Sequence, residues 1–114
     1  MTVSERKVGD VFVVDVSGKL VATDNPGRLK DKISSLVFQG EKQIVLNLGN
    51  VTYVDSSGLG EIIACHGSAT KGGADIKLAN AGKKIKDLLV MTRLLTVFDA
   101  HDTEDGALKA FAGR

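Results

Sequence analysis

A short, nearly continuous apolar run in the middle of the chain constrains its fold most strongly. Residues 43–48 read Gln-Ile-Val-Leu-Asn-Leu, so aliphatic side chains follow one another there with little polar alternation. A strand that is apolar on both faces is usually covered on both sides, as in a parallel sheet flanked by helices. The run therefore predicts a central strand of an α/β sheet, whose covering helices must come from the segments around it.

Regular turn signals divide the rest of the chain into strands and helices. Gly9-Asp10 predicts a hairpin between a strand at 3–8 and a strand at 11–17, which Gly18 ends. Asp24-Asn25-Pro26-Gly27 supplies a cap and a first-turn proline for a helix. The body of that helix extends to about Gln39-Gly40, with an apolar face of Leu29, Ile33, Leu36 and Val37. A second helix is expected after residue 55, with an apolar face of Leu59, Ile62, Ile63 and His66, and Gly72-Gly73 ends it. The remaining elements are a strand at 76–79, a helix after Gly82 (Ile85, Leu88, Leu89), a strand at 95–98, and a last helix opened by Thr103 and Asp105 (Leu108, Phe111).

The resulting order is β-β-α-β-α-β-α-β-α. It is typical of an α/β fold with a mixed sheet, antiparallel at the first strand and mostly parallel afterwards, with about four helices. At 114 residues, the chain is expected to form one domain over residues 1–114. Ligand and partner sites in such sheets lie at the carboxyl ends of the strands, which directs attention to the segment after the central strand.

Composition argues against several classes of function. The formal net charge is +1 and Trp is absent, so neither charge nor stacking favours nucleic-acid binding. Cys65 is the single cysteine, which excludes an internal disulfide and fits a reducing compartment. Because the chain has only two histidines, His66 and His101, no transition-metal site is expected. No run approaches the roughly 20 apolar residues of a membrane span, and the N-terminus lacks a signal peptide's apolar core. A cytoplasmic protein without direct membrane contact is expected.

Hydroxyl side chains stand where the central strand passes into a helix. The sequence from residue 54 to residue 57 is Val-Asp-Ser-Ser. A helix N-terminus exposes unpaired N–H groups and a partial positive charge, so a serine there can cap the helix or carry a phosphate. Asp55 can cap the helix unaided, which makes the hydroxyls of Ser56 and Ser57 redundant as caps and favours a second role.

Small or unusual residues follow in the same helix. Gly58 and Gly60 fall in its first turn, where glycine is unfavourable. They predict either close packing of the helix against the sheet or a bare backbone that lets a partner approach Ser56. Cys65 is expected to be a small buried hydrophobe, and His66 a core or boundary residue.

Three motifs spread over nearly the whole chain carry a resemblance to a known family. They are Gly18-Lys-Leu20; Ile44-Val-Leu-Asn-Leu48 with Val51-x-Tyr-Val-Asp-Ser-Ser-Gly-Leu-Gly60; and Ile85-x-x-Leu-Leu-Val-x-Thr-x-Leu-Leu-x-Val-Phe98. On these motifs the chain resembles the STAS domain family, in its single-domain form, the anti-sigma factor antagonist. The resemblance implies the STAS-like mixed sheet.

The same resemblance implies a partner-switching protein that regulates transcription and is not an enzyme. The family's phosphoacceptor is the first serine of the pair, here Ser56, with Ser57 as the secondary candidate. The unphosphorylated form binds an anti-sigma factor that is also a serine kinase and supplies the ATP; phosphorylation releases it, and a PP2C-type phosphatase restores binding. No cofactor or metal is expected on this chain. The residues expected at the partner contact are Asp24, Asp55, Ser56, Ser57, Gly58 and Gly60.

One departure from the family pattern keeps a second function open. Kinase substrates of the family carry an acid in a Gly-x-Leu/Ile-Asp pattern, whereas this chain has Val21 at that position and Asp24 three residues later. The alternative is a STAS subunit or interaction module of a membrane transporter or other signalling assembly, without phosphorylation. A third hypothesis is a small hydrolase using Ser56, although no histidine partner or Walker-type loop is evident.

Overall fold

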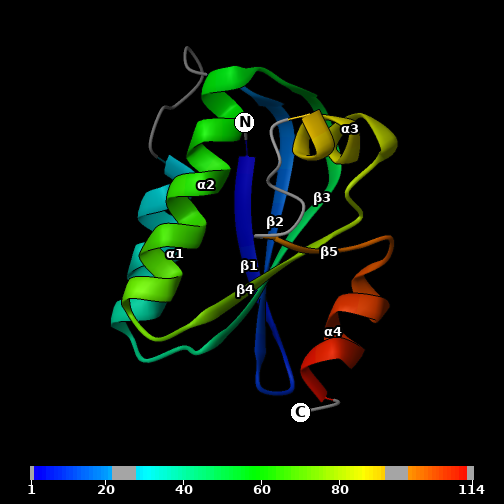
Figure 1. Ribbon diagram of the computed structural model, residues 1–114. Helices are drawn as coiled ribbons and strands as arrows, with labels where there is room; N and C mark the ends of the chain where they lie inside the picture. The colour runs from blue at the N-terminus through cyan, green and yellow to red at the C-terminus, as the bar shows by residue number, and fades with distance from the viewer. Residues whose placement is uncertain (1, 22–27, 92–97, 113–114) are drawn as a thin grey trace.

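The computed structural model describes residues 2–21, 28–91 and 98–112. Within these ranges five strands form one sheet, and four helices pack around it (Figure 1). The order is β1 (Thr2–Val8), β2 (Val11–Leu20), α1 (Arg28–Phe38), β3 (Gln43–Val54), α2 (Ser56–Lys71), β4 (Asp75–Ala79), α3 (Lys83–Met91), β5 (Asp99–His101) and α4 (Glu104–Ala112). The predicted order of elements and the mixed α/β class are confirmed. None of the helices in these ranges is long and apolar enough to cross a membrane.

The strands follow one another across the sheet in chain order. β1 pairs antiparallel with β2 through a tight hairpin at Gly9, and every later neighbouring pair is parallel. β3 pairs with β2 as far as Val54, but with β4 only as far as Asn47. The last part of β3 therefore projects beyond the end of β4, and α2 starts from this projection.

Alternate residues of β3 feed two separate apolar cores. Ile44 and Leu46 belong to a large cluster with residues of α1 and α2, which lie side by side on one face of the sheet (Figure 1). Val45 belongs to a second cluster with Phe111 of α4 on the other face. Both faces of the central strand are thus covered, which explains why its sequence is apolar without alternation.

Predicted strand boundaries were wrong for β3 and for β2. The central strand, predicted over residues 43–48, continues to Val54. Gly18 does not end β2, which continues to Leu20; its φ of 90° lies at an irregularity in the pairing of β2 with β3, where the strand bulges without terminating. The last described strand is Asp99–His101, and Phe98, the one described residue of the strand predicted at 95–98, is not part of it. Phe98 lies before this strand and is 3% exposed, because its ring packs in the core; residues 95–97 lie outside the described ranges.

Where the structure describes their residues, the helices agree with their predicted patterns except at one position; the side chain of Leu88 lies outside what is described. Ile63 is 40% exposed rather than buried, because it lies beside the buried face of α2 and not on it. That face consists of Gly58, Leu59, Ile62, Cys65 and Ala69. The predicted opening of α4 is confirmed, since the Thr103 hydroxyl accepts a hydrogen bond of 2.9 Å from the N–H of Gly106. The predicted cap segment at 24–27 lies outside the described ranges.

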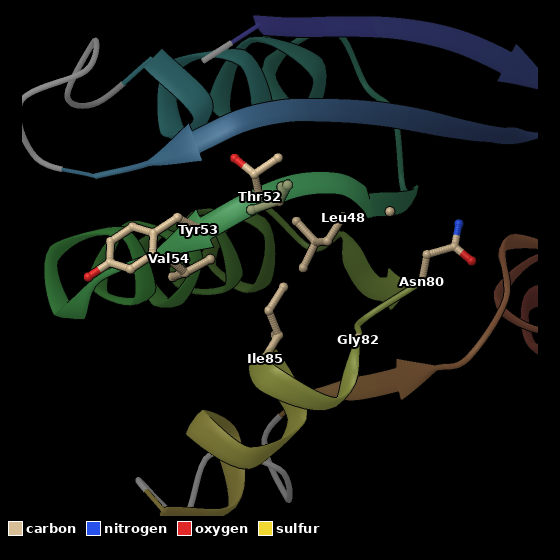
Figure 2. Close-up of a pocket in the computed structure, with 9 residues that line it drawn as sticks. Leu48, Thr52, Tyr53, Val54, Asn80, Gly82 and Ile85 are labelled. Atoms are coloured by element: carbon tan, nitrogen blue, oxygen red, sulfur yellow. The ribbon is translucent and has the colours of Figure 1, made fainter.

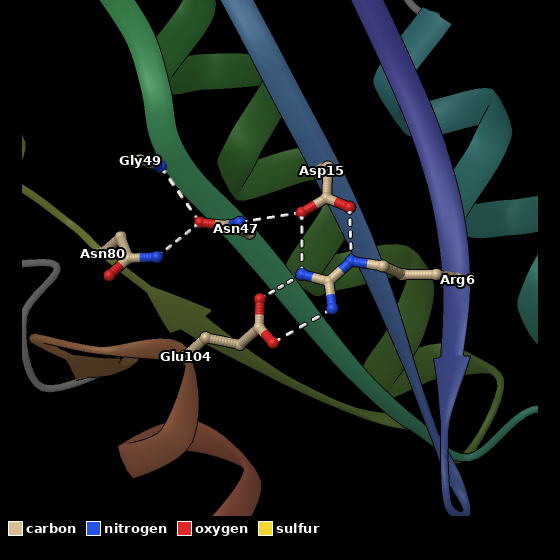
Figure 3. Close-up of polar contacts among 6 residues, drawn as sticks. All are labelled: Arg6, Asp15, Asn47, Gly49, Asn80 and Glu104. Carbon is tan, nitrogen blue, oxygen red and sulfur yellow. Dashed lines mark hydrogen bonds and ion pairs between the residues drawn. The ribbon is translucent and has the colours of Figure 1, made fainter.

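An ion-pair cluster ties the edge strand β1 and helix α4 to the sheet (Figure 3). The Arg6 guanidinium donates to Asp15 on β2, with Nε–Oδ2 at 2.8 Å, and also pairs with Glu104 at the start of α4. The hydrogen bond from Arg6 holds the pKa of the Asp15 carboxyl below its ordinary value. Because Arg6 reaches both partners at once, β1 and α4 are fixed to the same point of the sheet.

Asn47 extends this cluster toward the loop after β4 (Figure 3). Its amide nitrogen donates to Asp15 at 2.7 Å, and its amide oxygen accepts from Asn80 at 2.8 Å and from the N–H of Gly49 at 3.1 Å. Asn80 has a positive φ of 54°, a conformation that asparagine tolerates better than most residues. The one polar residue inside the apolar run therefore positions the loop that leads to α3.

Replacing Arg6 by Gln should lower the free energy of unfolding by about 1 kcal/mol at neutral pH, a modest loss because the guanidinium is 44% exposed. The pKa of Asp15 is lowered in the folded state. The stabilisation that the ionised Asp15 carboxylate gives the folded state is therefore fully present above about pH 4 and is lost as the pH falls through the folded pKa. Urea unfolding at several pH values should show wild type and variant converging below about pH 4.

The matched control is Lys109→Gln, which removes an ion pair with Asp105 whose two side chains are 77% and 73% exposed. It should cost less than about 0.5 kcal/mol. Equal losses in the two variants, or a difference between wild type and Arg6→Gln that persists in acid, would contradict the role of the cluster.

Candidate functional site

The candidate site is the junction of β3 and α2. Asp55 follows the end of β3 with an extended backbone and is the N-cap residue of α2. Its carboxylate oxygen Oδ1 accepts a hydrogen bond of 2.7 Å from the N–H of Gly58, and its carbonyl oxygen accepts one of 2.9 Å from Leu59. The predicted cap is confirmed, and it uses no serine side chain.

Ser56 and Ser57 are the first two residues of α2, and both are exposed. The N-terminus of this 16-residue helix carries the partial positive charge that favours an anion. Both hydroxyls are therefore accessible at a position that tolerates a phosphate.

The two glycines of the first turn have different roles. A Cβ on Gly58 would lie 1.9 Å from the carbonyl oxygen of Leu20, so the backbone of α2 touches the end of β2 there. The same Leu20 oxygen accepts a hydrogen bond of 3.4 Å from the N–H of Asp55. A Cβ on Gly60 would meet nothing within 4 Å. Close packing accounts for Gly58, whereas Gly60 leaves a bare, open backbone beside the serines.

Glu61 has a structural role that the sequence analysis missed. Its carboxylate oxygen Oε2 accepts a hydrogen bond of 3.0 Å from the N–H of Leu29, in the first turn of α1. This hydrogen bond fixes the start of α1 against the first turns of α2. No local sequence pattern predicts it. Asp24, which was expected at the partner contact, lies outside the described ranges.

A shallow hollow beside the serines contains the position at which the family acid is missing. It is lined by Lys19, Val21, Thr52, Tyr53 and Asp55. Lys19 of β2 lies opposite Tyr53 of β3 in the pairing of the two strands. The hollow next to Asp55 therefore presents a lysine and a valine in place of a second carboxylate.

A separate apolar cleft lies between the projecting part of β3 and the start of α3 (Figure 2). Its volume is about 110 Å³, and its apolar walls include Leu48, Val51, Val54 and Ile85. No sequence signal indicates this cleft, because it exists only where β4 is shorter than β3.

The other singled-out residues of α2 are structural. Cys65 is fully buried, and burial raises the pKa of its thiol to about 12, so it behaves as a small hydrophobe as predicted. His66 is half-buried, with its ring edge-on to Phe98 at 5.1 Å. It lies ten positions after Ser56, about 15 Å along a helix axis, too far to serve as its base. The part of the chain that the structure describes holds no group of three or more metal-ligating side chains.

The fold and the site together define an α/β domain whose accessible features gather where a helix starts from a parallel strand. The family model of the STAS domain matches residues 3–107, and the chain belongs to this family.

Two curated relatives and two solved forms of one protein are similar to the chain over most of its length. It is 27% identical to the anti-sigma-B factor antagonist of Bacillus subtilis (strain 168), over 84% of this chain and 86% of that protein. It is 21% identical to BtrV of Bordetella bronchiseptica, over 97% of this chain and 95% of that protein. The unphosphorylated form of the anti-sigma factor antagonist SpoIIAA has the same fold, with a TM-score of 0.75 and 21% identity over 99% of this chain and 100% of that chain. The phosphorylated form of SpoIIAA from Bacillus gives a TM-score of 0.73, with 20% identity over 96% of this chain and 99% of that chain.

The glycines provide a matched pair of variants. Gly58→Ala should lower the free energy of unfolding by about 3 kcal/mol, because the added methyl group meets a backbone carbonyl that cannot move aside easily. Gly60→Ala should raise it by up to about 1 kcal/mol, because alanine favours helix and nothing obstructs its Cβ. Thermal and urea unfolding measure both changes, and losses of similar size would refute the proposed close approach.

The N-cap of α2 provides a second set of variants. Asp55→Ala should cost about 1 kcal/mol, since the N–H of Gly58 loses its partner. Ser56→Ala and Ser57→Ala should change the free energy of unfolding by less than about 0.5 kcal/mol. A loss for Ser56→Ala as large as that for Asp55→Ala would show that the Ser56 hydroxyl is needed as a cap.

Proposed function

We propose that the chain is an anti-sigma factor antagonist that binds a kinase-type anti-sigma factor in the cytoplasm and is switched off by phosphorylation of Ser56. ATP is supplied by the partner kinase, and a PP2C-type phosphatase restores the binding form. The observation that carries this proposal is that Asp55 caps α2, which leaves the Ser56 hydroxyl exposed and without a structural duty. The named relatives support the same class of function.

The switch acts by exclusion at the interface. A phosphate adds about −1.5 to −2 charges at the exposed start of α2. Burying such a dianion in a desolvated interface without a cationic partner costs several kcal/mol, which lowers affinity by orders of magnitude. The released form then stays unbound until the phosphate is removed.

The fold itself need not change when the phosphate is added. The start of α2 is held by the Asp55 cap and by the contact of Gly58 with Leu20, neither of which uses the serine hydroxyl. Glu61, the next acid along α2, accepts a hydrogen bond from the start of α1. Solved unphosphorylated and phosphorylated forms of SpoIIAA both share this fold, which supports a switch without refolding.

The hollow beside Asp55 supports a second candidate function. Because Val21 stands where kinase substrates of the family are expected to carry an acid, and Lys19 lines the same hollow, the chain also suits a STAS interaction module that binds its assembly without phosphorylation. Such a module is expected to stay with a transporter or other signalling complex in every growth condition.

The test uses the purified protein with each purified kinase-type anti-sigma factor of its host, in the presence of ATP. Phosphate should appear on Ser56, be absent in Ser56→Ala and remain in Ser57→Ala. Ser56→Asp should weaken partner binding at least about 100-fold while leaving Tm within a few degrees of wild type. Ser57→Asp is the matched control and should bind more tightly than Ser56→Asp.

Wild-type affinity in Ser56→Asp would reject the switch. Phosphate retained in Ser56→Ala and lost in Ser57→Ala would move the switch to Ser57. An unmodified Ser56 peptide under all growth and stress conditions, together with co-purification in a membrane complex, would favour the constitutive module.

A further inference from the structure

Over the described parts of the chain, one edge of β3 has no neighbouring strand near the candidate site. β2 pairs with β3 as far as Val54, whereas β4 stops pairing at Asn47. Among the residues that the structure describes, no strand lies beside residues 48–54 on that side, and the start of α3 takes the place beyond β4 (Figure 2). An uncovered strand edge presents backbone donors and acceptors that an extended segment of another chain can pair with.

The cleft beside this edge has the size of one side chain. Leu48 and Ile85 point toward each other across it (Figure 2). Its volume of about 110 Å³ is smaller than the roughly 150 Å³ apolar cavity that holds a benzene molecule. Ligand pockets for cofactor-sized molecules start at about 300 Å³. A branched aliphatic side chain fits this volume, whereas a nucleotide does not.

The cleft also selects by charge. None of the described residues that line it is charged. The open depression next to it, by contrast, is lined by Lys83, Lys86, Asp87 and Asp102. A neutral, apolar group is therefore the occupant that the cleft can desolvate without leaving a charge unpaired.

We propose that this cleft anchors an extended segment of the protein partner, with a leucine or isoleucine side chain between Ile85 and β3 and with its backbone lying along β3. The inference rests on the proposed function, since it assumes a protein partner. The same strand leads directly through Asp55 to Ser56, so the anchor and the switch lie on one continuous surface. Tyr53, 47% exposed at this surface, adds the type of side chain that is enriched at interfaces.

The walls of the cleft are formed before any partner arrives. Leu48 and Ile85 are 2% and 7% exposed, so both are held by the core. Asn80, at the turn between β4 and α3, is fixed to Asn47 by a hydrogen bond of 2.8 Å. A preformed cleft requires little ordering on binding, which favours affinity from a small contact.

The first experiment titrates the ¹⁵N-labelled wild-type protein with N-acetyl-leucine N-methylamide, a leucine side chain between two peptide groups, to tens of millimolar. Saturable chemical-shift changes are expected at residues 49–54 and 82–85, with N-acetyl-alanine N-methylamide giving much weaker ones. Gly82→Leu places a side chain at the cleft, where a Cβ meets nothing within 4 Å, and should weaken the binding at least about tenfold. Gly67→Leu, at an equally open glycine of α2 outside the cleft, should bind as wild type does.

A second experiment uses any anti-sigma factor that binds in the phosphorylation test and measures hydrogen exchange in the complex. Protection should extend from the start of α2 back along residues 49–54. No saturable change with the leucine probe, or equal binding of the alanine probe, overturns the inference. So does protection confined to residues 55–60, or a dimer of this chain that Gly82→Leu dissociates.

The two proposals fail separately. Leucine-probe binding at the cleft with a Ser56 that no kinase modifies would reject the phosphorylation switch and retain the anchor. Phosphorylation of Ser56 and partner binding with an unoccupied cleft would retain the switch and reject the anchor.

Discussion

The backbone contact between the end of β2 and the first turn of α2 determines the rest of the site. The carbonyl oxygen of Leu20 accepts from the N–H of Asp55 and occupies the space that a Cβ on Gly58 would need. The helix is therefore pressed directly onto the sheet at its first turn, with no side chain between them. This contact orients Ser56 outward and brings Asp55 beside the hollow that contains Lys19.

Local signals predicted the parts of the structure that local interactions decide. The apolar run at 43–48 and the spacing of turn residues predicted the order of strands and helices, because periodicity and turn chemistry act over a few residues. The cap at Asp55 was predictable for the same reason. Gly18 was misjudged as a terminator because whether a glycine ends a strand or bulges it depends on the neighbouring strand, which the sequence does not display.

Features that depend on distant partners were beyond reach of the sequence. Gly58 and Gly60 look alike in the chain, and only the position of Leu20 distinguishes them. The bond from Leu29 to Glu61 joins two helices, and the cleft depends on β3 being longer than β4. The sequence placed Ser56 at an exposed helix start, and the structure has it there; its phosphorylation stays a prediction.

The separation of the Asp55 cap from the Ser56 hydroxyl has a consequence for evolution. When one residue both stabilises a helix and carries a modification, losing the modification also costs stability. Here the carboxylate of Asp55 satisfies the N–H of Gly58, so the neighbouring position is free of that constraint. A single substitution at residue 56 can therefore change which side chain is offered at this helix start without removing the hydrogen bond that caps the helix.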